Sequence, residues 1–244
     1  MQEFNILSGK KWAVCGDSFT NGDFKGAPEG EPRFESGAFA GRLRTYGNLI
    51  AARNGMIVQH LAVGGMTLAT PSDEPFQNTF SGGLYRTIDA DADYITLCFG
   101  INDSHHRPKS VADDGEVKKG IILLGDPDDA RIDTFCGAWN VVLEHIITHH
   151  PYAHLGILVS NGCETDDYRA ATIAAARRWG VPYLDLNGDE RTPAMGRSTN
   201  PAISRQVRDF RTRMFAVDPP RNTHPNARAH EFESVFIEGW LRTI

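Results

Sequence analysis

Lys11–Ser18 reads KWAVCGDS, a short apolar run that ends in Gly16, Asp17 and Ser18. Such a run is typical of a strand that is buried on both faces of a parallel sheet. Gly16 permits a sharp turn, so we expect Ser18 to stand at the carboxyl end of the strand, where α/β sheets bind ligands. A hydroxyl exposed there, with backbone N–H groups beside it, can perform acyl transfer. Taken alone, the tripeptide is more often an ordinary turn or helix cap.

Strand and helix patterns alternate along the rest of the chain. Further buried strands are predicted at Met56–Val63, Tyr94–Phe99, His154–Ser160 and Val181–Leu186. Helical spacing predicts helices over Ala38–Arg53, Ile132–His149, Thr165–Trp179 and Asn226–Leu241. The buried stripe predicted for the last helix is Phe232, Val235, Phe236 and Trp240. This alternation indicates an α/β fold in which helices cover both faces of a parallel sheet.

Composition narrows the class of protein. The chain has 244 residues, of which 41% are hydrophobic and 23% charged, and we expect one domain over 1–244. A charged insert at about 104–131 is expected to form a lid or a wall of the substrate site. A net charge of −6 argues against nucleic acid or an anionic membrane as the main partner. The sequence shows no signal peptide and no apolar run of the roughly 18 residues that span a membrane, which favours a cytoplasmic protein. Reduced thiols are then expected at Cys15, Cys98, Cys136 and Cys163.

Glycine and polar residues follow the second and third predicted strands as well. Gly64-Gly65 is either a plain tight turn or a place where N–H groups approach a ligand. Asn102, two residues after Gly100, either organises its own loop or directs its amide at a developing negative charge. His224 lies in a loop, held by the following Pro225 just before the last helix, and is placed to act as a fixed base.

The order of these pieces resembles the SGNH (GDSL-like) hydrolase superfamily over roughly Lys11 to Leu241. The resemblance implies a three-layer α/β/α, flavodoxin-like fold with five parallel strands, and a serine esterase or deacylase that uses no metal and no cofactor. The positions that match the family's motifs are Gly16-Asp17-Ser18, Gly65, Gly100, Asn102, Asp103 and His224.

The resemblance also implies roles. Ser18 would attack the ester carbonyl while His224 accepts its proton. The N–H groups of Ser18 and Gly65, with the side-chain amide of Asn102, would form the oxyanion hole. Supporting residues that orient the loops would be Asp17, Gly100 and Asp103.

One position departs from the family pattern. The family places an aspartate three residues before its histidine, where this chain has Arg221. Asp218 is the nearest upstream carboxylate. Either it reaches the imidazole and completes a triad, or the site is a Ser–His dyad in which a backbone carbonyl or a water orients the histidine. The expected substrate is a small-molecule or carbohydrate ester with a short acyl or acetyl group, since the sequence shows no large apolar lid.

Two other functions stay open. An SGNH-like scaffold could bind an acyl or glycan group without turnover, which Arg221 in the aspartate position favours. A metal-dependent hydrolase could use Asp103, His105 and His106. Adjacent histidines rarely share one ion, and no HExxH pattern accompanies them.

Overall fold

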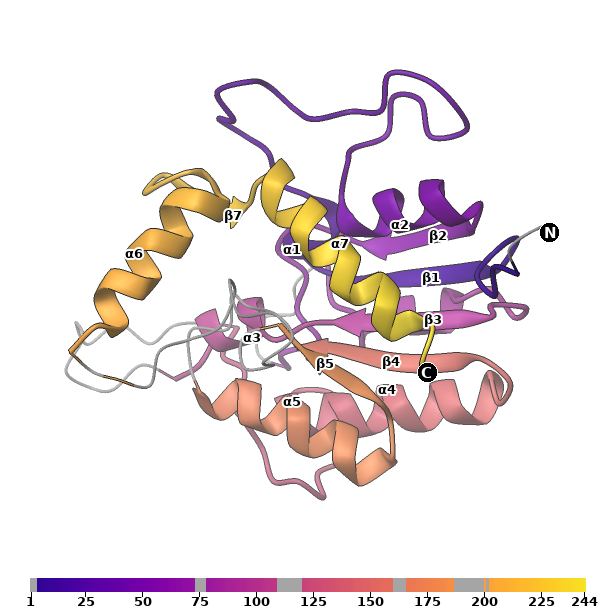
Figure 1. The fold of residues 1–244 in the computed structure, drawn as a ribbon. Helices are drawn as coiled ribbons and strands as arrows, with labels where there is room; N and C mark the ends of the chain where they lie inside the picture. Colours follow the sequence, from indigo (N-terminus) through magenta and orange to yellow (C-terminus); the bar gives the residue numbers. More distant parts are fainter. Residues whose placement is uncertain (1–3, 73–77, 109–119, 160–165, 187–199, 201) are drawn as a thin grey trace.

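A five-stranded parallel sheet forms the centre of the computed structural model, which describes residues 4–72, 78–108, 120–159, 166–186, 200 and 202–244 (Figure 1). The strand order is β2-β1-β3-β4-β5. The strands are β1 (Lys11–Gly16), β2 (Ile57–Ala62), β3 (Tyr94–Cys98), β4 (His154–Val159) and β5 (Tyr183–Asp185). Every neighbouring pair in this sheet is parallel, so the predicted fold class is confirmed.

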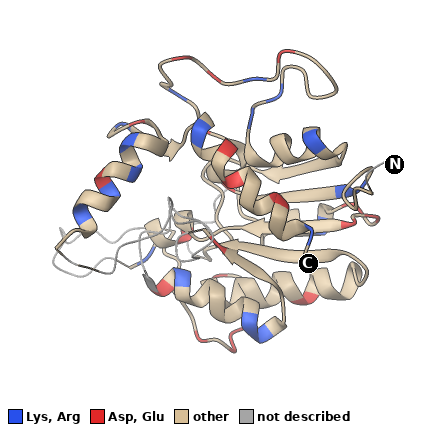
Figure 2. Cartoon of the chain, viewed as in Figure 1, with Lys and Arg blue, Asp and Glu red and all other residues tan. Residues whose placement is uncertain are grey.

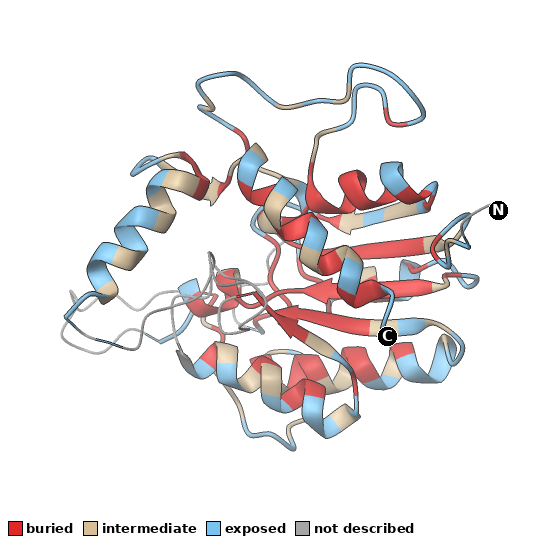
Figure 3. Ribbon diagram, viewed as in Figure 1, coloured by how far each residue is buried: buried red, intermediate tan, exposed pale blue. Residues whose placement is uncertain are grey.

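Helices cover both faces of the sheet (Figure 1). One face carries α2 (Tyr46–Asn54) and α7 (Ala227–Leu241), which pack against each other. The other carries α4 (Phe135–His149) and α5 (Asp166–Trp179). Of these strands, β1, β3 and β4 are the most deeply buried, whereas β2, at the edge of the sheet, is partly exposed and so differs from the strand buried on both faces that we expected there (Figure 3). The architecture is therefore a three-layer α/β/α sandwich.

Side chains along β1 pack alternately into two apolar clusters, one on each face of the sheet. Trp12 and Val14 belong to the apolar cluster under α2 and α7. Ala13 and Cys15 belong to the cluster under α4 and α5. Because side chains of a strand point alternately to opposite faces, a strand covered on both sides must be apolar at every position.

Two helices differ from their predictions. The helix predicted to begin at Ala38 begins at Tyr46, because Gly41 has a left-handed φ of +78° and Leu43 instead forms a β-bridge with Arg33. On α7 the predicted stripe is wrong at Val235, whose side chain is 64% exposed. The side chains that α7 buries are Ala229, His230, Glu233, Ser234, Ile237, Trp240 and Leu241.

Several short elements have no counterpart in the prediction. They are α1 (Ser18–Asn21), the 3₁₀ helix η1 (Leu84–Thr87), α3 (Ile101–His105), α6 (Ser204–Phe215), β6 (Ala216–Asp218) and β7 (Asn222–Pro225). β6 and β7 pair as an antiparallel hairpin just before α7. α6 extends away from the sheet, buries only Phe215 and is rich in arginine (Figures 2 and 3).

Some predictions fall on residues that the structure does not describe. The middle of the predicted insert, 109–119, is one such segment, and 160–165, which includes Cys163, is another. Among the described helices, none has both the length and the apolar character needed to cross a lipid bilayer.

Candidate active site

The turn after β1 brings Ser18 to the carboxyl edge of the sheet. A side chain on Gly16 would place a Cβ 2.3 Å from Thr20 Oγ1 and 3.0 Å from the Cys98 carbonyl, so only glycine fits there. Asp17 caps the following helix, because its Oδ1 accepts a hydrogen bond of 2.9 Å from Phe19 N–H. Ser18 is consequently the first residue of α1, and its N–H has no acceptor within the helix.

His224 reaches Ser18 from the other end of the chain. Its Nε2 lies 2.8 Å from Ser18 Oγ, a contact between residues 206 positions apart. The β6–β7 hairpin holds the imidazole in place, and the Phe19 ring packs on it with centroids 5.3 Å apart. The structure thus brings together the two residues that the sequence analysis proposed as nucleophile and base.

The far side of the imidazole contacts residues that the sequence analysis did not name. Nδ1 of His224 lies 2.7 Å from Asn222 Oδ1 and 3.9 Å from an Asp23 carboxylate oxygen. A signal for Asn222 was available, since residues two apart on a strand share a face. No such local signal existed for Asp23, which belongs to a distant loop.

Asp218 does not lie against His224 in this arrangement. Its carboxylate forms a bidentate ion pair with Arg221, with Nε–Oδ2 2.9 Å and Nη2–Oδ1 3.1 Å. For the Asp218 carboxylate, the adjacent Arg221 guanidinium is a stronger partner than the neutral imidazole of His224, because it carries a full charge and two aligned N–H donors. The Arg221 side chain is 81% exposed, whereas that of Asp218 is 23% exposed.

The segments after β2 and β3 flank Ser18, because β1 lies between those two strands. Gly65 sits in the exposed loop after β2 with a left-handed φ of +75°. Gly100 has φ +124° and leads into α3, whose Asn102 donates a 2.8 Å hydrogen bond to the Met66 carbonyl. An amide has two N–H donors, so this bond leaves Asn102 a second one.

Asp103 ties α3 to the loop after β2. It is fully buried and accepts hydrogen bonds from Leu68 N–H at 3.0 Å and Ala69 N–H at 2.9 Å. Burial raises the pKa of Asp103 to about 6, although these two bonds lower it in part. Burial, together with the nearby Asp103, raises the pKa of Asp17 to about 7. Asp103 thus contacts the loop after β2 through two backbone N–H groups, and Asp17 caps α1 through one.

Three influences act on the basicity of His224. Burial is the largest and lowers its pKa, Asp23 raises it, and His105 lowers it, with a net pKa below the ordinary value. The imidazole is therefore neutral near pH 7 and can accept a proton. His105 is exposed, yet it lies close enough to lower the pKa of His224.

The geometry gives a metal-dependent reaction no support. Asp103, one of its three proposed ligands, directs both carboxylate oxygens at backbone N–H groups. Within the described part of the chain, no three His, Cys, Asp or Glu side chains are grouped so that they could hold an ion.

Solved structures share this architecture. A protein from Lactobacillus plantarum is 23% identical, with a TM-score of 0.63 over 97% of this chain and 98% of that one. A Bacteroides ovatus protein described as a GDSL-like lipase is 15% identical, with a TM-score of 0.59 over 97% of this chain and 100% of that one. An acetyl xylan esterase from the rumen bacterium Butyrivibrio proteoclasticus is 14% identical, with a TM-score of 0.56 over 97% and 64%. At these identities the likeness shows the fold alone, a three-layer α/β/α sandwich.

Sequence comparison supplies the family. A search of curated proteins finds no match. The model of the GDSL-like lipase/acylhydrolase family matches residues 14–232, a range that begins within the strand before Ser18 and ends beyond the hairpin that carries His224. With both halves of the site inside one family match, the chain belongs to the GDSL-like lipase/acylhydrolase family.

Proposed function

We propose that the protein is a serine esterase or deacylase in which Ser18 is the nucleophile and His224 the general base. The observation that carries the proposal is the 2.8 Å contact between Ser18 Oγ and His224 Nε2. As Oγ attacks the ester carbonyl, Nε2 accepts its proton, and the resulting imidazolium then donates that proton to the leaving alcohol. In deacylation, Nε2 accepts a proton from the attacking water, and the imidazolium then donates that proton to Ser18 Oγ as the carboxylic acid product leaves.

Three donors make up the oxyanion hole in this proposal. They are the N–H of Ser18, the N–H of Gly65 and the second amide hydrogen of Asn102. Donors that are already oriented before the reaction stabilise the tetrahedral intermediate without reorganising. Asp103 supports this role, because it holds the loop after β2 against α3, the helix that carries Asn102.

A short acyl or acetyl ester, carried on a carbohydrate, is the substrate class that we propose. The support is the structural likeness to an acetyl xylan esterase, together with the family match. A series of p-nitrophenyl esters from acetyl to long acyl, followed by acetylated sugars, measures this directly through kcat/KM.

Replacement of the nucleophile tests the proposal. Ser18→Ala is expected to abolish hydrolysis of p-nitrophenyl acetate and labelling by a fluorophosphonate probe, because the acyl-enzyme forms on that hydroxyl. Ser8→Ala, which alters an exposed serine, is the matched control and should keep both. Mass spectrometry should locate the adduct on Ser18.

Two results would decide against the proposal. Full activity in Ser18→Ala, or an adduct on another serine, would exclude Ser18 as the nucleophile. Alternatively, a folded wild-type protein that binds acetylated sugars but neither turns over esters nor reacts with the probe would be the binding module considered above.

A further inference from the structure

The geometry of β7 explains why the residue three positions before His224 does not contact its imidazole. Asn222 and His224 both lie on β7, where residues two apart share a face. A side chain three residues before the histidine precedes the strand, and Arg221 there turns toward Asp218 and solvent. In this hairpin the residue placed to meet the imidazole is therefore Asn222.

The hydrogen bonds of Asn222 fix the orientation of its amide. Its Nδ2 donates to two backbone carbonyls of the first loop, which is the loop that follows α1: Lys25 O at 2.9 Å and Asp23 O at 3.3 Å. Carbonyl oxygens only accept, so the NH₂ group must face that loop and Oδ1 must face the imidazole. Oδ1 then accepts from His224 N–H at 3.0 Å and lies 2.7 Å from His224 Nδ1.

This orientation determines where His224 carries its proton. An amide oxygen cannot donate, so the 2.7 Å contact requires the proton on Nδ1. Nε2 then presents its lone pair to Ser18 Oγ at 2.8 Å. That is the tautomer a general base needs, and an asparagine performs the same task in Cys–His–Asn proteases.

An amide, however, has no charge with which to stabilise an imidazolium. The nearest carboxylate in the described structure is that of Asp23, whose Oδ2 lies 3.9 Å from His224 Nδ1. Its other oxygen accepts a 3.0 Å hydrogen bond from Lys25 N–H, which holds the carboxylate in place. A negative charge at this distance favours the protonated imidazole.

We propose that Asn222 and Asp23 divide between them the work of the family's single aspartate: Asn222 fixes the tautomer and orientation of His224, and Asp23 supplies the negative charge that stabilises the imidazolium. Both are positioning residues that act through His224. The inference rests on the proposed esterase mechanism, because it assigns roles around the same base.

Burial and two charged or titratable groups set the pKa of His224: Asp23 from the first loop and His105 from the end of α3. Removing the Asp23 charge leaves the two influences that lower the pKa of His224. The acid limb of the kcat/KM profile, which reports that pKa in the free enzyme, should then move to lower pH.

Two substitutions separate the two roles. Asn222→Ala is expected to lower kcat by about 10² to 10⁴ with little change in KM, because the tautomer is no longer fixed. Asn222→Asp, which keeps an acceptor for Nδ1–H, should recover part of that loss. Asp23→Asn should lower kcat by about tenfold and shift the acid limb to lower pH.

Matched controls lie on the same hairpin. Asp218→Asn removes a carboxylate that pairs with Arg221, and Thr223→Ala alters an exposed side chain of β7. Both should leave kcat and the acid limb unchanged. A ¹⁵N NMR titration of the His224 ring adds a readout that needs no turnover: the wild type should carry its proton on Nδ1, and Asp23→Asn should lower the titration midpoint.

The outcomes keep this inference distinct from the proposed function. If the wild type neither hydrolyses esters nor labels at Ser18, the proposed function fails. If the wild type is active but Asp23→Asn leaves the titration midpoint and pH profile unchanged, or Asp218→Asn produces the shift instead, the role of Asp23 is wrong. Wild-type kcat in a folded Asn222→Ala variant would refute the role of Asn222.

Discussion

Asn102 illustrates how one side chain can be fixed and still available. Its amide donates one hydrogen to the Met66 carbonyl, which holds the side chain in place. In the proposed oxyanion hole, the second amide hydrogen donates to the negative charge that develops on the carbonyl oxygen. A donor that is oriented in this way acts on the transition state more than on the bound ester.

Asn102→Ala is therefore expected to lower kcat with little change in KM. The loss of one oxyanion donor typically costs about 2.7–4 kcal/mol of barrier, or about 10² to 10³ in kcat. Steady-state kinetics on a short ester measures both constants, and thermal unfolding checks the fold. A variant in which only KM changes would mean that Asn102 binds the ground state.

Asp17 gives a second prediction at the scale of one residue, through its effect on stability. The ordinary pKa of its carboxyl is 3.8, and burial is the main cause that raises this pKa to about 7 in the fold. Between these values the folded protein binds a proton that the unfolded chain has lost. The stabilising contribution is complete below pH 3.8 and disappears as the pH rises through about 7.

Asp17→Asn removes this pH dependence, because an amide does not ionise. Relative to the wild type, the variant should gain stability as the pH rises from about 4 to 8, by up to about 4 kcal/mol for a three-unit shift. Chemical denaturation of both proteins across this range measures the difference. Parallel stability curves would mean that Asp17 ionises in the fold as it does in the unfolded chain.

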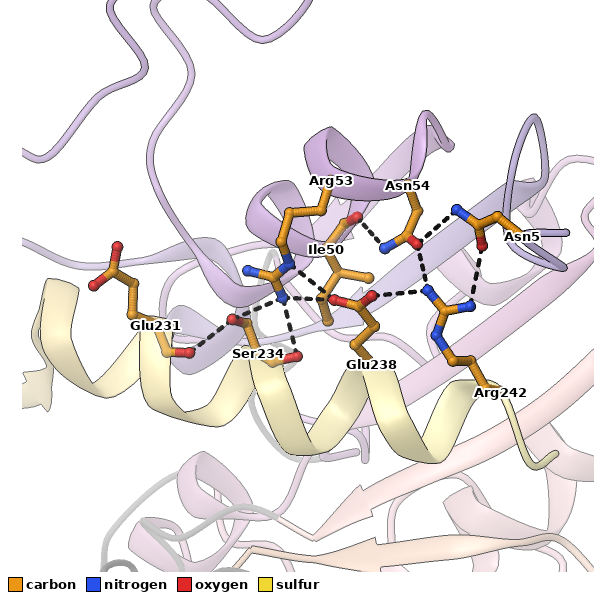
Figure 4. A network of polar contacts seen from close by, with 8 residues as sticks. All are labelled: Asn5, Ile50, Arg53, Asn54, Glu231, Ser234, Glu238 and Arg242. Carbon is orange, nitrogen blue, oxygen red and sulfur yellow. Dashed lines mark hydrogen bonds and ion pairs between the residues drawn. The ribbon is translucent and has the colours of Figure 1, made fainter. Parts of the chain in front are cut away.

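At the scale of elements, a polar network joins α2, α7 and the N-terminal segment (Figure 4). Glu238 is its centre and accepts hydrogen bonds from Arg53 at 2.8 Å and Arg242 at 2.9 Å. Arg53 also reaches Ser234, and Arg242 reaches Asn54 at 2.6 Å. The pKa of Glu238 lies below its ordinary value: burial raises it, and the bonds from Asn54 and the two arginines lower it by more.

A double-mutant cycle on Arg53 and Glu238 should measure this docking contact. We expect a coupling free energy of about 0.5–1.5 kcal/mol, above that of exposed pairs, because the Glu238 side chain is only 18% exposed. The exposed pair Arg33–Glu31 is the control and should couple by less than about 0.5 kcal/mol.

Catalysis should be unaffected by those substitutions. Glu238 lies in the second half of α7, about 16 Å along the helix from its start beside His224, at 1.5 Å per residue. An unchanged kcat in the Arg53→Ala variant, at a lower free energy of unfolding, would show that the network stabilises the fold alone. A large loss of kcat would instead mean that α7 docking controls the position of His224.

Element length explains only some of the predictions that failed. The sequence located the five strands of the parallel sheet and the helices α4, α5 and α7 to within a few residues, whereas α6 was missed although it has 12 residues. α1 and α3 have four and five residues, too few for a helical period. The stripe of α7 was misplaced because Glu233, Ser234 and His230 are buried by contacts with other elements, which hydrophobicity alone cannot indicate.

For the whole molecule, the site is an outcome of topology. The strand order places β1 between β2 and β3, so the residues after all three strands meet at one edge of the sheet. The hairpin then carries His224 to Ser18 across 206 positions of sequence. Ser18, Gly65, Asn102 and His224 are thus drawn from four segments, and the sequence identifies each only because parallel α/β sheets place function at that edge.

The sequence by itself determined the layered α/β fold, the family and the identity of Ser18 and His224 as the candidates for chemistry. These follow from local patterns: apolar strands, helical periods and short motifs at strand ends. Only the tertiary structure decided what meets the far side of the imidazole. Asp218 is the carboxylate nearest in sequence, but the Arg221 guanidinium pairs with it. Asn222 and Asp23 contact His224 because the first loop folds against the hairpin, and contacts between distant segments leave no periodic trace in either one.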